Sequence, residues 1–73
     1  MNVRPIGPNQ TELSTEKGII FLSYRTPVAA CIDGRYYKTE VKWSATTSRH
    51  IFRWLPGGVE VEIKPQAFFD GLL

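Results

Sequence analysis

The fold is decided by the stretch Ile19-Ile20-Phe21-Leu22-Ser23-Tyr24, in which apolar side chains occupy both alternating faces. A short apolar run of this kind is typical of a β-strand that is covered on both sides. Thr26-Pro27 interrupts the pattern after it. We therefore expect a central strand here, with the other elements arranged around it.

The residues before this strand predict a hairpin and an arm. Residues 11–15 tolerate β-structure, and Glu16-Lys17-Gly18 is typical of a three-residue hairpin loop with glycine at the left-handed position. Residues 1–9 contain two prolines, a glycine and two asparagines, a composition typical of a flexible N-terminal arm. The expected organisation is this arm followed by one small domain over residues 10–73.

The residues after the central strand predict a second hairpin. Residues 28–32 are expected to form a strand, and Asp33-Gly34 is a strong turn signal because both residues tolerate positive φ. The return strand, residues 35–43, alternates between two faces. These faces are Tyr37, Thr39, Val41 and Trp43 on one side and Tyr36, Lys38, Glu40 and Lys42 on the other.

The last third of the chain predicts a helix, a strand and a short helix. The N-cap candidates for the first helix are Ser44, Thr46, Thr47 and Ser48. Pro56-Gly57-Gly58 ends this helix, residues 59–64 alternate as a one-sided strand, and Pro65 suits the start of a final helix. The expected order is ββββαβα. The fold class is therefore α+β, with a four-stranded antiparallel meander, a helix, a further strand and a short C-terminal helix.

Size and charge limit the function classes. The chain has 73 residues, of which 42% are hydrophobic and 22% charged, as in ordinary globular domains. The net charge of +2 is uneven, because residues 25–53 carry six basic against two acidic side chains, a net of +4. A domain this small has a thin stability margin, and its single cysteine excludes an internal disulfide. Self-association is the expected extra support.

Catalysis finds little support in the sequence. His50 is the only histidine and Cys31 the only cysteine, and no spacing implies that they meet. A nucleophile motif and a phosphate-binding glycine loop are both absent from the sequence. Glu60 and Glu62 share one face of a strand, which we interpret as a solvated face. We expect no enzyme activity, no catalytic residues, no cofactor and no metal.

The leading expectation is a non-enzymatic protein that self-associates and binds a protein partner. Two tryptophans, three tyrosines and four phenylalanines are more than one small core encloses easily. Two short helices are expected to cover only one face of the central strand, which leaves the other face for a partner chain. The residues expected at the contact between copies are Ile20, Leu22, Tyr24, Phe52, Trp54 and Phe69.

Nucleic-acid binding is the alternative. Aromatic side chains that stack on bases, together with cations that follow phosphates, are the means by which sheets bind single strands. Tyr36 shares a predicted face with Lys38 and Lys42, although Glu40 interrupts that face and the net charge gives a weak field. The residues expected to bind are Arg35, Tyr36, Lys38, Lys42, Arg49, His50 and Arg53.

Three strings of the sequence carry a resemblance. They are the segments over residues 26–30 (TPVAA), 36–40 (YYKTE) and 42–51 (KWSATTSRHI), with Phe68-Phe69-Asp70 at the end. Across about residues 24–73 they resemble a small domain of unknown function from bacteriophages and archaeal genomes. The resemblance implies a small, phage-encoded cytosolic protein of unknown function, and it supplies no catalytic residues. If the chain is phage-encoded, the expected partner is a host protein.

The expected compartment is the cytoplasm, or the host cytoplasm if the chain is phage-encoded. The N-terminal residues lack the apolar segment of a secretory signal. The longest apolar run, Ile19 to Leu22, is far shorter than the roughly 20 residues that span a bilayer. We expect no membrane partner, and Cys31 suits a reducing compartment.

Overall fold

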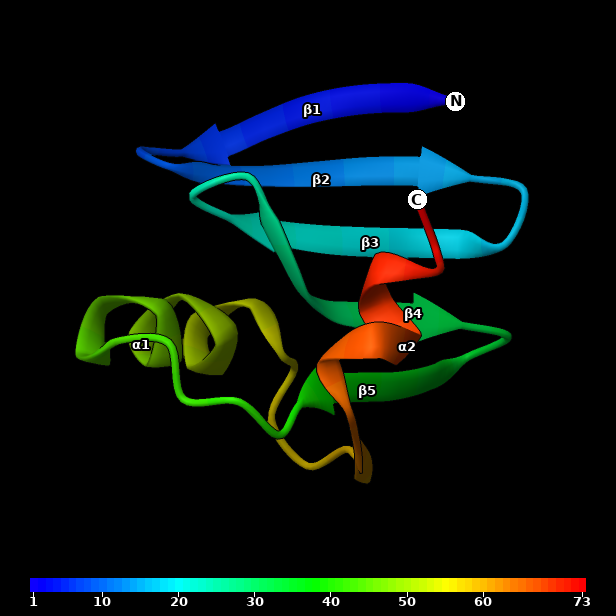
Figure 1. The fold of residues 1–73 in the computed structure, drawn as a ribbon. Coiled ribbons are helices and arrows are strands. Elements are labelled where there is room, and N and C mark those ends of the chain that lie inside the picture. The colour runs from blue at the N-terminus through cyan, green and yellow to red at the C-terminus, as the bar shows by residue number, and fades with distance from the viewer.

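A computed structural model describes all 73 residues and contains one six-stranded sheet and two helices (Figure 1). The sheet order is the chain order, β1 to β6. Neighbours from β1 to β5 are antiparallel, whereas β6 is parallel to β5. The elements are β1 (Asn2–Gly7), β2 (Gln10–Thr15), β3 (Gly18–Ser23), β4 (Thr26–Ile32), β5 (Arg35–Thr39), α1 (Ala45–Trp54), β6 (Val61–Lys64) and α2 (Gln66–Asp70).

The expected four-stranded antiparallel meander, and with it the ββββαβα order, is wrong. The sheet is mixed and has six strands, because residues of the expected N-terminal arm form β1 and because β6 joins the same sheet in parallel. Pro5 lies within β1, where the missing N–H is tolerated because this strand is at the edge. The short parallel strand β6 reaches its place through α1, since parallel neighbours need a crossover connection.

The expected hairpin at Asp33-Gly34 is confirmed. Both residues have positive φ, 52° and 77°, the conformation of a two-residue turn between twisted strands. The expected end of the central strand is displaced, because the turn after β3 is Tyr24-Arg25 and Pro27 lies buried within β4. The helix expected between the N-cap candidates and Pro56 is confirmed: it is α1, and Ser44 is the candidate that caps it.

Gly18 is required for a reason other than the expected loop. The turn before β3 is only Glu16-Lys17, and Gly18 itself begins the strand with φ of 144°. A Cβ atom at this position would clash with the carbonyl oxygen of Cys31 on the neighbouring strand. Glycine therefore allows β3 and β4 to pair closely at this end.

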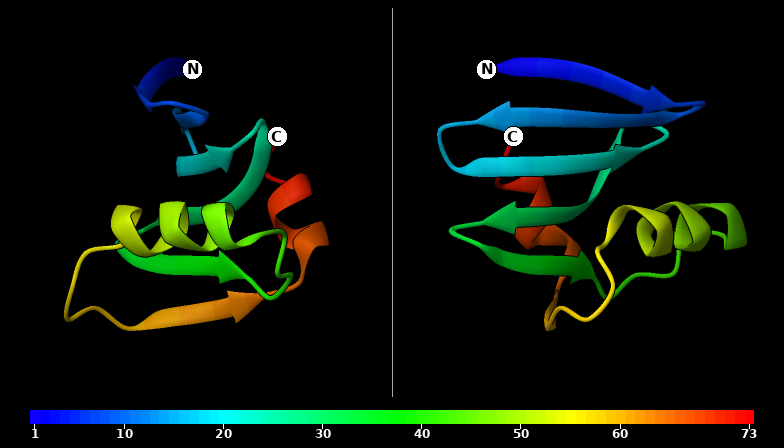
Figure 2. Two further views of the ribbon diagram at one scale, coloured as in Figure 1. Left: turned by 90° about the vertical axis from the view of Figure 1, so that its left-hand side faces the viewer. Right: turned by 180° about the vertical axis from the view of Figure 1, so that it is seen from behind.

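The two helices cover opposite faces of the sheet. Phe21 and Ala29 face α1, where they form the core with Val28 and Ile51. Strand geometry then directs Ile20, the neighbour of Phe21, to the other face. There α2 packs on β4, and it crosses the front of the sheet in Figure 1 and lies behind it in the reversed view of Figure 2.

This arrangement corrects the expectation that a partner chain covers one face of the central strand. Ile20 is fully buried by its own chain, and so is Phe69 on α2. The register gives this face a continuous row of cross-strand neighbours. The row, called the apolar row below, consists of Val3, Leu13, Ile20, Ala30 and Tyr37.

A polar clamp ties the edge strand β1 to helix α1. Arg4 Nη2 donates to Glu12 Oε1 at 2.7 Å, and Trp54 Nε1 donates to Glu12 Oε2 at 2.7 Å. The Trp54 ring stacks on Phe21, with ring centroids 5.2 Å apart. One carboxylate in β2 therefore orients two neighbouring elements.

No helix of this fold is long and apolar enough to cross a bilayer.

Candidate functional site

Helix α1 presents a basic and aromatic outer face. The Ser44 side chain accepts a hydrogen bond from the Thr47 backbone N–H and so caps its first turn. Its inner face buries Thr47, His50 and Ile51. Residues three and four apart share a helix face, so the outer face gathers Arg49, Phe52 and Arg53, all exposed. The Phe52 side chain is 81% exposed.

The β3–β4 turn lies against the same helix. Tyr24 stacks on the His50 ring with centroids 5.9 Å apart, and its backbone N–H donates to the carbonyl of Asn9 at 2.9 Å. Tyr24 and Arg25 both have positive φ, 52° and 70°. A side chain in this region costs roughly 1–2 kcal/mol per residue, so the turn stores strain that its contacts must offset.

A buried polar network fixes His50 beneath Tyr24. Ser23 Oγ lies 2.9 Å from His50 Nδ1 and 3.1 Å from Thr47 Oγ1, within hydrogen-bond distance of both. All three residues are buried, and no buried side-chain nitrogen or oxygen in the structure lacks a partner. A fully satisfied network of this kind makes its surroundings rigid. We call Ser23, Thr47 and His50 the polar network.

The basic side chains of residues 25–53 form no ion pairs. The structure contains two ion pairs, Arg4–Glu12 and Lys64–Glu62. All six basic side chains of residues 25–53 therefore lack a carboxylate partner. Three of them lie in the β3–β4 turn and on the outer face of α1, beside two exposed aromatic rings. We call this set the arginine surface; it consists of Tyr24, Arg25, Arg49, Phe52 and Arg53.

The seven residues expected to bind nucleic acid do not form one surface. Arg35 lies on the α2 side of the sheet, whereas Tyr36 and Lys38 lie on the α1 side. Tyr36 is half-buried beneath the helix, where its ring and that of Trp54 meet edge to face with centroids 6.0 Å apart. His50 is buried in the polar network. The exposed members are Arg35, Lys42, Arg49 and Arg53.

The expected contact residues between copies are divided in the same way. Ile20 and Phe69 are inside the core and cannot reach a second copy without unfolding. Leu22 and Trp54 are half-buried, and Trp54 donates to Glu12. Tyr24 and Phe52 are exposed, and both belong to the arginine surface.

The structure keeps Cys31 away from His50. Cys31 pairs with Ile19 at one end of β3, and the His50 ring contacts Ser23 at the other end, four residues or about 13 Å along the strand. Cys31 instead neighbours Tyr36 across β4 and β5. A side-chain hydrogen bond with Cys31 raises the pKa of Tyr36, and the charge of the thiolate adds to this.

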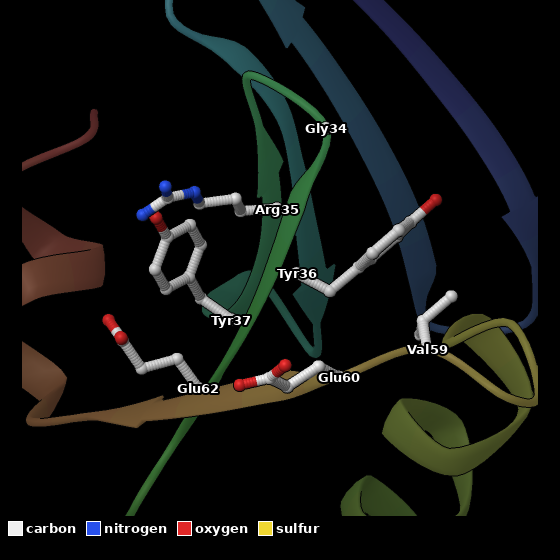
Figure 3. Close-up of a pocket in the computed structure, with 7 residues that line it drawn as sticks. All are labelled: Gly34, Arg35, Tyr36, Tyr37, Val59, Glu60 and Glu62. Carbon is white, nitrogen blue, oxygen red and sulfur yellow. The ribbon is translucent and has the colours of Figure 1, made fainter.

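A separate hollow of about 520 Å³ lies between β5 and the start of β6 (Figure 3). Its lining is Gly34, Arg35, Tyr36, Tyr37, Val59, Glu60 and Glu62. Figure 3 shows Arg35 and Tyr37 on one side of β5 and Tyr36 on the other. One arginine faces two glutamates here, and Glu62 also pairs with Lys64 at 2.9 Å. Because the charges are mixed and the lining side chains lie on both sides of β5, the hollow does not indicate one class of ligand.

The sequence predicts neither the polar network nor the Tyr24-Arg25 turn. Ser23 is separated from Thr47 and His50 by more than twenty positions, and no local pattern relates them. The turn lacks the glycine or asparagine that normally marks positive φ. The regular spacing of the meander is the signal that could have found it, because the β3–β4 connection is as short as the other three.

The sequence matches the model of a protein family described as "Family of unknown function (DUF8033)" over residues 1–71. This confirms the expected resemblance to a domain of unknown function and extends it from residues 24–73 to nearly the whole chain. The match includes β1, the polar network and the arginine surface. No curated protein and no solved structure matches the chain.

Proposed function

The chain belongs to this family of unknown function, DUF8033, and we propose that it binds nucleic acid through the arginine surface. The observation that carries the proposal is the gathering of three arginines without ion pairs around two exposed aromatic rings. Arginine contacts to phosphate supply most of the sequence-independent affinity of proteins for nucleic acid. The proposal moves the expected binding face from the sheet to the outside of α1.

Geometry supports a shared surface. Tyr24 stacks on His50, which marks one position around the circumference of α1. At 3.6 residues per turn, the basic and aromatic side chains that follow around the helix from His50 are Arg53, then Arg49, then Phe52. Arg25 is the second residue of the turn that contains Tyr24. Arg49 and Arg53 therefore lie on one side of the helix, and the turn that contains Arg25 packs against the same helix, so that one phosphate backbone can extend across both elements.

The test is a titration of fluorescently labelled DNA, single-stranded and duplex, with the protein at several salt concentrations. We expect binding that weakens as salt rises. The double variant Arg49→Ala/Arg53→Ala should lower the slope of log affinity against log salt by about 2, since each arginine that neutralises a phosphate contributes about 1 to the slope.

Arg35→Ala is the matched control, because Arg35 is also exposed but lies on the opposite side of the sheet. It should leave the slope unchanged. The absence of binding at low salt contradicts the proposal. A decrease in affinity with Arg35→Ala as large as that with either single helix variant contradicts the assignment to the arginine surface.

We also propose that two copies associate through the outer half of the apolar row. Helix α2 covers the inner half, over β4, but Val3 on the edge strand is 61% exposed beside half-buried Leu13. A second copy would remove this apolar surface from water. This proposal keeps self-association as the source of extra stability, at a place different from the one expected.

Sedimentation equilibrium tests the association. We expect a dimer at micromolar to millimolar concentrations and a monomer for Val3→Asp, because a carboxylate would be desolvated at the contact. Val41→Asp is the control, since Val41 is also exposed but lies outside the apolar row. A monomer at high micromolar concentration of the unmodified protein contradicts the association.

An origin in a phage genome and a host-protein partner stay predictions from the resemblance, because the family description names neither source nor partner. A cytoplasmic location likewise stays a prediction.

A further inference from the structure

The arginine surface carries two aromatic rings whose exposed faces make no ring pair within the protein. Phe52 makes none of the aromatic ring pairs in the structure. A phenylalanine that is 81% exposed adds no core stability in this chain and is unfavourable in water. Tyr24 uses one ring face against His50 and is 51% exposed.

The position of Tyr24 is fixed despite its cost. Its φ of 52° lies in the left-handed region, which residues other than glycine, asparagine and aspartate rarely adopt. The stack on His50 and the hydrogen bond to Asn9 hold it there, and the polar network holds His50. Strained residues that are held by their surroundings cluster at binding sites. The Tyr24 ring is thus a rigid platform.

The two rings flank the arginines. Around α1 the order is Tyr24 on His50, then Arg53, then Arg49, then Phe52. A ligand that follows this surface meets an aromatic face, two cations and a second aromatic face. Phosphates alone would use the cations and leave both rings unoccupied.

Unpaired bases fit this alternation of rings and cations. In a duplex the base faces are stacked inside the helix, and only base edges and phosphates are accessible. In a single strand each base exposes a π-face that stacks on an aromatic side chain, while the backbone lies along basic groups. Resting on the proposed function, we infer that the arginine surface binds single-stranded nucleic acid, with bases stacked on Phe52 and on the free face of Tyr24.

The test compares three labelled ligands of equal length: oligothymidylate, an abasic oligonucleotide with the same phosphates, and a mixed-sequence duplex. The unmodified protein should bind oligothymidylate most tightly. The variant Phe52→Leu remains apolar and exposed but lacks a ring. It should weaken binding of oligothymidylate roughly 5- to 100-fold, the effect of removing one base stack, and leave the other two affinities unchanged.

The variant Arg49→Ala/Arg53→Ala separates this inference from the proposed function. It should weaken binding of all three ligands, since all carry phosphates. If Phe52→Leu has no effect on oligothymidylate while the arginine variant weakens every ligand, the inference fails and the proposed function stands. If no ligand binds at low salt, the proposed function fails as well.

The free face of Tyr24 has its own test. Tyr24→Phe keeps the ring and should preserve the affinity for oligothymidylate, whereas Tyr24→Asn relieves the turn and removes the ring. We expect the asparagine variant to be at least as stable and to bind oligothymidylate several-fold more weakly. Equal affinity for both variants would overturn the role given to Tyr24.

Discussion

Single residues set how closely the strands approach and how the helix is seated. Gly18 lets β3 pair closely with β4, because a Cβ atom at this position would clash with the carbonyl oxygen of Cys31. Ser23 supplies the one hydroxyl that both Thr47 and His50 need. Neither role is visible in a local pattern, because each depends on a strand or helix that arrives from elsewhere in the chain. Substitutions at both positions should therefore have effects that their local sequence does not indicate.

Gly18→Ala should lower the free energy of unfolding by about 1–3 kcal/mol, because φ of 144° is strained for alanine and its Cβ would meet the Cys31 carbonyl. Urea denaturation measures the change. Gly57→Ala is the control, since a Cβ atom there meets nothing within 4 Å. It should change stability by less than about 0.5 kcal/mol. Equal effects of both substitutions would contradict the close approach of β3 and β4.

Ser23→Ala should lower the free energy of unfolding by roughly 1–3 kcal/mol, because His50 and Thr47 would each be left without a buried hydrogen-bond partner. Thermal denaturation gives the comparison with Ser48→Ala. Ser48 lies on the same helix but is exposed, so its variant should remain within about 0.5 kcal/mol of the parent protein. A neutral Ser23→Ala would show that the network does not hold the helix.

The β3–β4 hairpin combines residues that disfavour its turn with a position beside α1 that suits binding. Asp33-Gly34 in the next hairpin has the residues that such turns favour, and it was predictable for that reason. Tyr24-Arg25 has neither glycine nor asparagine, so the sequence predicts a strand through Tyr24 instead. Tertiary contacts with α1 override the local preference. The hairpin is therefore the element where stability and binding are expected to conflict.

Arg25→Gly should raise the free energy of unfolding by about 1 kcal/mol, because glycine adopts φ of 70° without strain. The same variant should bind single-stranded DNA more weakly, since the arginine surface then has one cation fewer. Arg25→Ala removes the cation but keeps the strain, so it should weaken binding equally without the gain in stability. Thermal melts and DNA titrations of the pair measure both effects. A gain in stability with alanine would contradict the role of strain.

The sequence predicts the helix α1, but it does not predict how α1 packs on the sheet. The run of N-cap residues and the helix stop at Pro56-Gly57-Gly58 are local signals, and the structure follows them. The orientation of His50 depends on Ser23 and Tyr24, which lie in β3 and its turn. The sequence predicts Arg49 and Arg53 as binding residues because four-residue spacing alone places them on one face. It places His50 with them because nothing local marks that side chain as buried.

The small sheet is stabilised because each helix covers a different face. The α1 face buries Phe21, Ala29 and Ile51, and the α2 face buries Ile20 and Phe69. The sequence correctly predicts that β3 is covered on both faces, but it predicts a partner chain where the structure has α2. The reason is that a five-residue helix such as α2 has almost no stability of its own, and only its docking defines it. Pro5 likewise leads the sequence to predict a flexible arm where the structure has the edge strand β1.

Phe69→Ala should lower the free energy of unfolding by about 3–5 kcal/mol, because this side chain of α2 is fully buried. A domain of this length has a total of about 4–11 kcal/mol, so the variant should be largely unfolded by mild heating. Phe52→Ala, the same substitution on the outer face of α1, should leave the melting temperature within a few degrees. Similar melting of both variants would contradict the cover that α2 provides.

The order of the strands in the sheet also predicts the order in which they form during folding. The four connections from β1 to β5 are two residues long, so each hairpin can close locally at small entropic cost. Only β6 must wait for a crossover of residues 40–60. We expect the meander to form in the folding transition state and the crossover to dock afterwards. Phe69→Ala should then accelerate unfolding and leave the folding rate nearly unchanged, as stopped-flow kinetics would show.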